Sequence, residues 1–163
     1  GRSQFIGFLL WSVMLCAQRP PNELFPLTPL DQEQQMVLDS LANQSISALS
    51  NADVLYLANG YLQDRRYVEA LSYFDQLCDR DPNRFEYQLG RGASAGFLLS
   101  GTPSFRSFRY ITKLRSSFEA AVRIQPNSIV ARRALLNIYL GLPRLLGGSQ
   151  LKAEQQIKAI QLI

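Results

Sequence analysis

A short pattern of small, aromatic and proline residues limits what this chain can form. The stretch YVEALSYFDQLCDRDPN, residues 67–83, carries apolar residues at helical spacing and then a proline: Ala70, Phe74, Leu77 and Pro82. The spacing predicts a helix with one apolar face, and the proline ends that helix because it lacks a backbone donor. A helix of this kind needs a neighbour that covers its apolar face.

A second apolar stripe lies just upstream, at Leu57, Ala58 and Tyr61. Small side chains at Ala58 and Ala70 allow two helices to approach closely, and larger side chains fill the gaps beside them. Residues 51–84 are therefore predicted to form a helix-turn-helix unit. One such pair cannot bury its apolar face alone, so the pattern should recur along the chain.

The pattern does recur, in the segment SSFEAAVRIQPN. Three positions correspond pair by pair: Phe118 to Phe74, Ala121 to Leu77, and Pro126 to Pro82. Gly92 occupies the small position of the first helix in this second unit, so its additional residues fall between Gly92 and Phe118. Both helices of the second unit are expected to be longer by about a turn or more, with a helix start favoured at Thr102 and Pro103.

A third unit is expected to open at Asn127, with Ala134 at the small position. The segment GLPRLLGGSQ, residues 141–150, interrupts this unit before LKAEQQIKAI resumes a helical pattern. The resumed helix repeats the spacing of the first unit at Ala153, Ile157 and Ile160.

The first unit resembles the tetratricopeptide repeat (TPR), a 34-residue helix-turn-helix motif, here over residues 51–84. Val54 stands where that family often has tryptophan. The resemblance implies an all-α fold of antiparallel helix-turn-helix repeats in a right-handed α-solenoid, with about three units and lengthened second and third units. The three units span residues 51–163. The residues that carry the likeness are Leu57, Ala58, Tyr61, Ala70, Phe74, Leu77 and Pro82.

The turn in the third unit is similar to a P-x-L-L-G-G-x-x-x-K-A turn of several bacterial envelope repeat proteins, including the T-component of TRAP transporters. This likeness implies an alternative function, a periplasmic helper subunit of a TRAP-type solute-uptake system with a ligand cavity between the extended helices. The residues concerned are Pro143, Leu145, Leu146, Gly147, Gly148, Lys152 and Ala153.

The segment FIGFLLWSVMLCA, residues 5–17, is uncharged and follows Arg2. A membrane span needs roughly 20 apolar residues, so this shorter run favours a secretory signal peptide, with a membrane anchor as an alternative over residues 1–17. A lipoprotein signal modified at Cys16 and a buried core helix are further alternatives, and Leu15 weakens the former because a small residue normally precedes a lipidated cysteine. The segment predicts a periplasmic or cell-envelope protein, exported and either free or anchored.

The next stretch, RPPNELFPLTPL, contains four prolines in twelve residues, which disfavours helix. We expect residues 18–30 to form an extended linker and residues 31–163 to form the helical repeat domain. Asp31 is suited to cap a first helix that runs to about Asn43.

Composition argues against catalysis. The chain has no histidine, so it lacks the commonest general base and the commonest metal ligand. No nucleophile-base pair is apparent, and we expect no enzyme activity, no cofactor and no metal.

The net charge of +4 comes from scattered residues rather than a basic cluster, so no nucleic-acid partner is expected. Cys78 lies within a predicted helix and is expected to be a small buried apolar residue.

Two motif-like stretches are interpreted as packing features. GRGASAG, residues 90–96, follows no strand, so its glycines are expected to permit close helix packing rather than dinucleotide binding. SFRSFRY, residues 104–110, mixes aromatic residues with arginines, but Ile111 and Phe118 continue its helical spacing and predict a core-facing side. Phe105 is the candidate for an exposed contact.

Repeats of the TPR family commonly bind peptides in the groove lined by their first helices. At the positions of the family's carboxylate clamp only Asn59 and Arg132 match, and the absence of both clamp lysines removes most charge-assisted contacts. We therefore predict a different, mixed groove for a protein or peptide partner. Its residues are Leu55, Asn59, Leu62, Gln63, Glu86, Leu89, Ser128, Arg132 and Leu135.

The last stretch, IKAIQLI, places apolar residues in the final two turns of the third unit. Repeat arrays usually end in a helix with a polar outer face. We expect Ile160 to lie at a contact with another chain or with further residues. One such contact is self-association of the chain through this face.

The expected function is a non-catalytic protein-protein interaction scaffold or adaptor in the cell envelope, with membrane association through the N-terminal segment.

Overall fold

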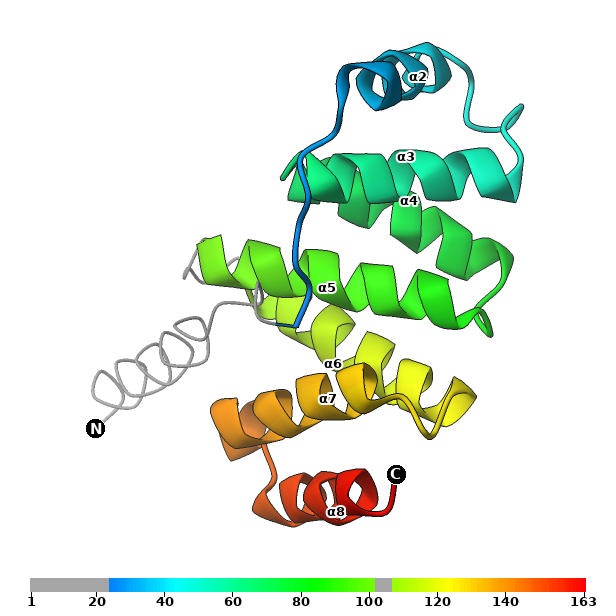
Figure 1. Ribbon diagram of the computed structural model, residues 1–163. Coiled ribbons are helices and arrows are strands. Elements are labelled where there is room, and N and C mark those ends of the chain that lie inside the picture. The colour runs from blue at the N-terminus through cyan, green and yellow to red at the C-terminus, as the bar shows by residue number, and fades with distance from the viewer. Residues whose placement is uncertain (1–23, 102–106) are drawn as a thin grey trace, which may run out of the picture.

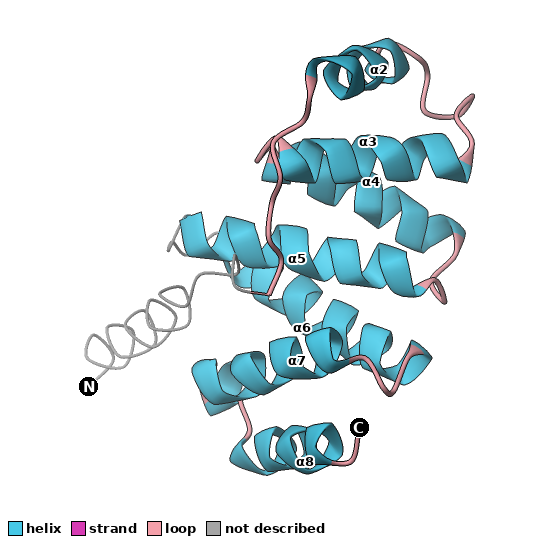
Figure 2. Cartoon of the chain, in the orientation of Figure 1, coloured by secondary structure: helices cyan, strands magenta, loops and turns pink. Residues whose placement is uncertain are grey.

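The computed structural model describes residues 24–101 and 107–163. Within these ranges all regular elements are helices, and Figure 2 shows no strand there, which confirms an all-α fold. The elements are α2 (Gln32–Ala42), α3 (Asn51–Gln63), α4 (Tyr67–Arg80), α5 (Phe85–Gly101), α6 (Phe108–Ile124), α7 (Ile129–Gly141), the short 3-10 helix η3 (Arg144–Leu146) and α8 (Gln150–Gln161).

The helices are stacked in the order of the sequence, and from α3 onward the chain reverses direction at each step (Figure 1). Each helix packs mainly against the helix before it and the helix after it, and α3 also contacts α5. The helix α2 lies at one end of the stack against α3, and α8 lies at the other end against α7. The arrangement therefore depends mostly on contacts between neighbours in the chain.

Local signals determine where the first helices begin. The Asp31 carboxylate accepts a hydrogen bond from the backbone N–H of Gln34 at 2.8 Å, and the Gln34 side chain accepts one from the backbone of Asp31 at 3.0 Å. Ser50 and Asp53 form the same reciprocal capping box at the start of α3. The predicted helix from Asp31 to about Asn43 is confirmed, because α2 is capped by these two residues.

Two apolar clusters form the core. One joins α2, α3 and α4 with part of α5, and the other joins the rest of α5 and Leu71 of α4 with α6, α7 and α8. The helix α5 contributes Tyr87 and Phe97 to the first cluster and Ala95 and Leu99 to the second. It therefore connects the two halves of the molecule.

The residues that defined the sequence pattern lie in this core. Ala58, Ala70, Phe74 and Leu77 are completely inaccessible to solvent, and Phe118 is 1% exposed. The corresponding residues of the later units, Ala121, Ala134 and Ala153, are also buried. The exceptions are Ile157, which is 41% exposed on the terminal helix α8, Ile160, which is half-buried, and the helix-ending Pro82 and Pro126, which are exposed.

Glycines in α5 receive aromatic rings from both neighbouring helices. A Cβ atom at Gly90 would overlap the Phe74 ring of α4, and a Cβ atom at Gly92 would lie 2.7 Å from the Phe118 ring of α6. At either glycine the added Cβ atom would lie closer to the ring than a carbon-carbon contact allows. The prediction that GRGASAG permits close helix packing is confirmed, since the two rings occupy the space of the missing side chains.

The second and third units differ in where their additional residues lie. Helices α5 and α6 have 17 residues each, whereas α3 and α4 have 13 and 14. In the third unit α7 and α8 have only 13 and 12 residues, and the additional residues form the connection that contains η3. Gly147 ends η3 with a φ of 98°, a conformation that glycine adopts without a steric penalty. The predicted helix start at Thr102 and Pro103 lies outside the described residues.

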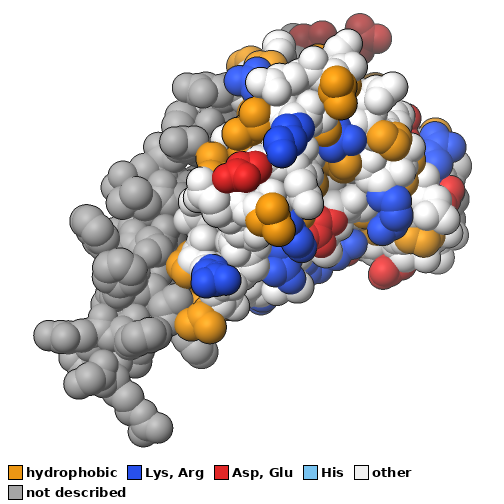
Figure 3. All heavy atoms as spheres, turned by 90° about the horizontal axis from the view of Figure 1, so that it is seen from below, with side chains coloured by type: hydrophobic (Ala, Val, Ile, Leu, Met, Phe, Trp, Pro, Cys, Tyr) orange, Lys and Arg blue, Asp and Glu red, His pale blue; other side chains and the backbone are white. Residues whose placement is uncertain are grey.

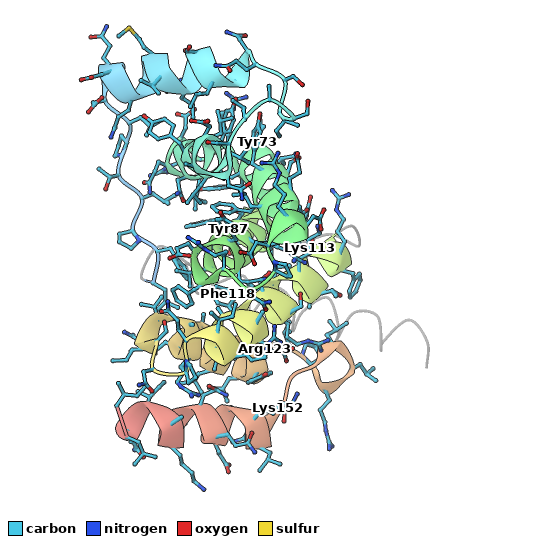
Figure 4. The ribbon with its side chains drawn as sticks, turned by 90° about the vertical axis from the view of Figure 1, so that its right-hand side faces the viewer. Tyr73, Tyr87, Lys113, Phe118, Arg123 and Lys152 are labelled. Carbon is cyan, nitrogen blue, oxygen red and sulfur yellow. The ribbon has the colours of Figure 1, made fainter. Side chains whose placement is uncertain are left out.

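Residues 24–30, here called the strap, contain no helix: Leu24 and Phe25 form a turn and a bend, and the rest runs drawn out along the stack (Figure 1). Phe25, Leu27 and Leu30 pack on the first cluster, while Leu24 and again Phe25 pack on the second. In Figures 1 and 4 the strap runs along the side of the stack formed by α3 and α5, with α4 and α6 on the opposite side. The packed region thus begins before Asp31, the residue at which the sequence placed its start.

The proposed signal peptide or anchor over residues 1–17 lies outside the described residues. No helix in the described ranges has the length and apolar character needed to cross a membrane.

Candidate functional site

One side of α3 carries three of the predicted groove residues. Leu55, Asn59 and Gln63 follow one another at intervals of four residues, which places them on the same side of the helix. Asn59 is exposed, and the other two are half-buried. Tyr56 belongs to another side, because its hydroxyl donates to the Gln34 carbonyl of α2 at 3.4 Å.

The first turns of α5, a helix in contact with α3, carry two more of the predicted residues. Glu86 is exposed and forms an open ion pair with Arg84, whose Nε lies 3.6 Å from the carboxylate. Such an exposed pair contributes little to stability and leaves the carboxylate accessible. Leu89 is half-buried and packs against the second apolar cluster. The α3–α5 face is defined here as Leu55, Asn59, Gln63, Glu86 and Leu89.

Two predicted groove residues belong to the core instead. Leu62 is 7% exposed and Leu135 is 2% exposed, and each is part of an apolar cluster. The sequence could not separate these positions from the surface, because apolar residues at the edge of a helical stripe fit either side. A partner on the surface can reach little of either side chain.

The two polar residues predicted on α7 hold helices in place. The Ser128 hydroxyl caps α7 by accepting from the Ala131 N–H at 3.3 Å. The Arg132 guanidinium donates to the Pro126 carbonyl at 2.6 Å and to Gln156 Oε1 of α8 at 2.9 Å. These bonds tie α7 to its preceding turn and to α8, so both side chains are already engaged within the chain.

The strap crosses the stack at the Gln63 end of the α3–α5 face and makes one hydrogen bond to that residue (Figure 1). The backbone N–H of Thr28 donates to Gln63 Oε1 at 2.6 Å. Farther along the strap, the Phe25 ring lies against the Phe118 ring of α6, with ring centroids 5.7 Å apart. Figure 4 shows Phe118 in the core at the level where the strap begins. The two contacts fix the strap at points on different helices.

The sequence predicted an extended linker over residues 18–30, of which 18–23 lie outside the described residues, and missed the contacts that residues 24–30 make with the helices. The signal for them is the composition LFPLTPL, in which four large apolar residues occupy seven positions. Large apolar side chains are stabilising only when packing removes their surface from water. They are therefore not expected in a linker that is exposed along its whole length. The alternation of proline with leucine or phenylalanine therefore indicated an extended segment that packs on a surface.

Charged side chains on the opposite side form a structural cluster. Asp75 of α4 pairs with Arg91 of α5, 3.2 Å from its Nε, and with Lys113 of α6. This carboxylate thus connects three helices.

Cys78 lies one turn further along α4 and is a free thiol, 5% exposed, as the sequence predicted. Burial raises the pKa of the Cys78 thiol, against the opposing effect of Arg91, so the reactive thiolate is disfavoured at neutral pH.

The end of the stack formed by α8 presents apolar and basic side chains side by side, as Figure 3 shows. Leu151 is 66% exposed, Leu162 is 88% exposed, and Lys152 and Lys158 are exposed between them. Ile160, the residue predicted to contact another chain, is half-buried. Phe105, the other predicted contact, lies outside the described residues.

Comparison of the chain with protein-family models, with curated proteins and with solved structures finds no match. Any function proposed for the chain therefore has to be argued from its own residues and their arrangement.

Proposed function

We propose that the chain is a non-catalytic protein-protein interaction scaffold built on TPR-type helical repeats. Three pairs of adjacent helices, α3 with α4, α5 with α6, and α7 with α8, carry buried residues at the positions that resemble the repeat. Contact between α3 and α5, the first helices of two successive pairs, agrees with a right-handed repeat stack. A stack of this kind presents its first helices along one side as a binding surface.

The observation that carries the proposal is the mixed character of the α3–α5 face. Asn59 and Glu86 are exposed polar groups, and Leu55 and Leu89 are half-buried apolar groups beside them. Both helices are anchored by the core, so these side chains stand on a rigid support. A rigid surface with apolar contacts and accessible hydrogen-bonding groups suits the binding of a protein or peptide.

The alternative, a helper subunit for TRAP-type solute uptake, requires a ligand cavity between the lengthened helices. At Gly92 the two longest helices, α5 and α6, are in direct contact through the Phe118 ring. This contact favours the scaffold.

We also propose that the chain and its partner are located in the cell envelope. This part of the proposal rests on the apolar N-terminal run of residues 5–17.

Substitution of one exposed residue on the α3–α5 face tests this function. We expect Asn59→Arg to reduce capture of a specific partner from extracts of the source cells by about tenfold or more, since a long charged side chain would stand within the contact. Ser72→Arg is the matched control, because Ser72 is exposed on α4 and gains the same charge. Bound proteins are captured with the tagged chain and quantified by mass spectrometry, and circular dichroism checks that both variants fold.

Capture that falls with Asn59→Arg and persists with Ser72→Arg would support the face as the binding surface. Equal capture by both variants, or loss with Ser72→Arg alone, would contradict it. Asn59 is exposed, so its substitution should leave the core unchanged and the melting temperature close to that of the parent chain.

A further inference from the structure

The strap contacts the helices in the way that a bound extended peptide would. Side chains of Leu24, Phe25, Leu27 and Leu30 pack on the two apolar clusters, and the main chain of Thr28 bonds to a side chain of the helical stack. Peptides added to a folded surface are commonly held by this combination, in which main-chain hydrogen bonds supply affinity and side-chain contacts supply specificity.

The strap is held by few interactions. In the described part of the chain its one hydrogen bond is the bond from Thr28 to Gln63. All four of its large apolar side chains are half-buried rather than buried. Release of the strap would break this bond and expose these four side chains, without removing a buried member of either cluster.

The residues of the strap are of few chemical types. Its seven residues, LFPLTPL, carry no charge, and two of them are prolines. Pro26 and Pro29 restrict the backbone to extended conformations and remove two N–H groups that would otherwise need partners. Thr28 keeps its N–H between them, and Gln63 accepts from that group. The Gln63 end of the face therefore fits an uncharged, proline-containing, extended segment.

We infer that the strap is an internal pseudoligand at the Gln63 end of the α3–α5 face, and that the partner of this face binds there through an uncharged extended segment in which leucine or phenylalanine alternates with proline. The inference rests on the proposed function and specifies the partner for the same face. Because the strap and the partner segment would use the same contacts, the partner must displace the strap.

Displacement regulates affinity. A ligand that binds only when the strap has left the face sees an apparent dissociation constant raised by the inverse of the fraction of open molecules. The strap is joined directly to α2, so its effective concentration at the face is high. Weakening the strap should therefore strengthen binding of the same segment added as a separate peptide.

A labelled peptide of residues 22–32, NELFPLTPLDQ, is the probe, and fluorescence anisotropy measures its binding to the full chain. We expect Phe25→Ala in the chain to tighten peptide binding by about tenfold or more, because it removes the contact with Phe118 that holds the strap. A peptide with serine in place of its phenylalanine should bind weakly to the same variant.

Position 28 supplies a matched pair of variants at an exposed residue. Thr28→Pro removes the N–H that donates to Gln63 and should tighten peptide binding, whereas Thr28→Ala keeps this group and should behave like the parent chain. Adding Gln63→Ala to the Phe25→Ala variant should weaken peptide binding about threefold to tenfold, since the peptide then lacks the same acceptor. Thermal melting checks that every variant is folded.

Tighter binding to Phe25→Ala and Thr28→Pro, with weaker binding after Gln63→Ala, would support the inference. Equal affinity for the parent chain and both strap variants would overturn it, because the peptide would then bind elsewhere. Absence of binding to both folded strap variants would also overturn it, and would identify the strap as a fixed part of the fold. The proposed function is tested separately by the Asn59→Arg capture experiment, so a partner lost with Asn59→Arg but unaffected by the peptide would leave the scaffold standing without the pseudoligand.

Discussion

Replacement of Phe74 by alanine is expected to lower the free energy of unfolding by about 3 to 5 kcal/mol. The Phe74 ring is completely buried and fills the space above Gly90, where no other side chain is present to take its place. Loss of the ring removes apolar area from the core and leaves a cavity between α4 and α5. Urea denaturation followed by far-ultraviolet circular dichroism measures the change.

Val68→Ala is the matched control on the same helix. Val68 is 61% exposed, so its truncation should change the free energy of unfolding by no more than about 0.5 kcal/mol. A loss of stability for Phe74→Ala as small as that of the control would show that Phe74 does not occupy the interface between α4 and α5.

Gly90→Ala is expected to destabilise the protein by about 1 to 3 kcal/mol, although alanine is the better helix former. The new methyl group would overlap the Phe74 ring, and that ring has little freedom to move in a closely packed core. Gly96→Ala, in the same helix, has Leu114 Cδ1 at 3.4 Å as its nearest neighbour. It should be neutral or stabilising by up to about 1 kcal/mol, because it gains helix propensity without an overlap.

The two substitutions at this contact should not be additive. In the Phe74→Ala background the Gly90 methyl group has no ring to overlap, so Gly90→Ala should lose its destabilising effect or partly fill the cavity. A double-mutant cycle by urea denaturation measures this coupling. Effects that simply add would mean that the ring and the glycine are not in contact in solution.

The helical core could be predicted from sequence because its rules are local. Ala58, Ala70 and Phe74 are buried as expected, since a small residue at a close helix approach and a ring beside it leave a periodic signature. The first helix, α2, could be placed by its cap at Asp31, which depends on residues three positions apart. In both cases the chemistry that determines the structure lies within one or two turns of chain.

The location of the strap could not be predicted in the same way. The prolines of residues 24–30 predict an extended backbone, but they do not determine which surface it follows. Its position depends on Gln63 and Phe118, which lie 35 and 93 residues away from their partners in the chain. Contacts over such separations leave no periodic pattern in the sequence.

The residues predicted to line a groove illustrate the same limit of sequence-based prediction. Helical spacing placed Leu55, Asn59 and Gln63 on one side of α3. It could not show that Arg132 would bond to Gln156 of α8, because the third unit turns through η3 before that helix begins. Arg132, which the sequence predicted to be available to a partner, is thus hydrogen-bonded within the fold.

The most direct test of the central claim, that a partner binds on the α3–α5 face, is site-specific photocrosslinking in the source cells. A photoreactive phenylalanine derivative is placed at Asn59, and in a separate strain at Ser72, both exposed positions. The account predicts that irradiation of the Asn59 variant gives a specific covalent adduct heavier than the chain, and that the Ser72 variant gives none. An adduct at Ser72 with none at Asn59 would contradict it.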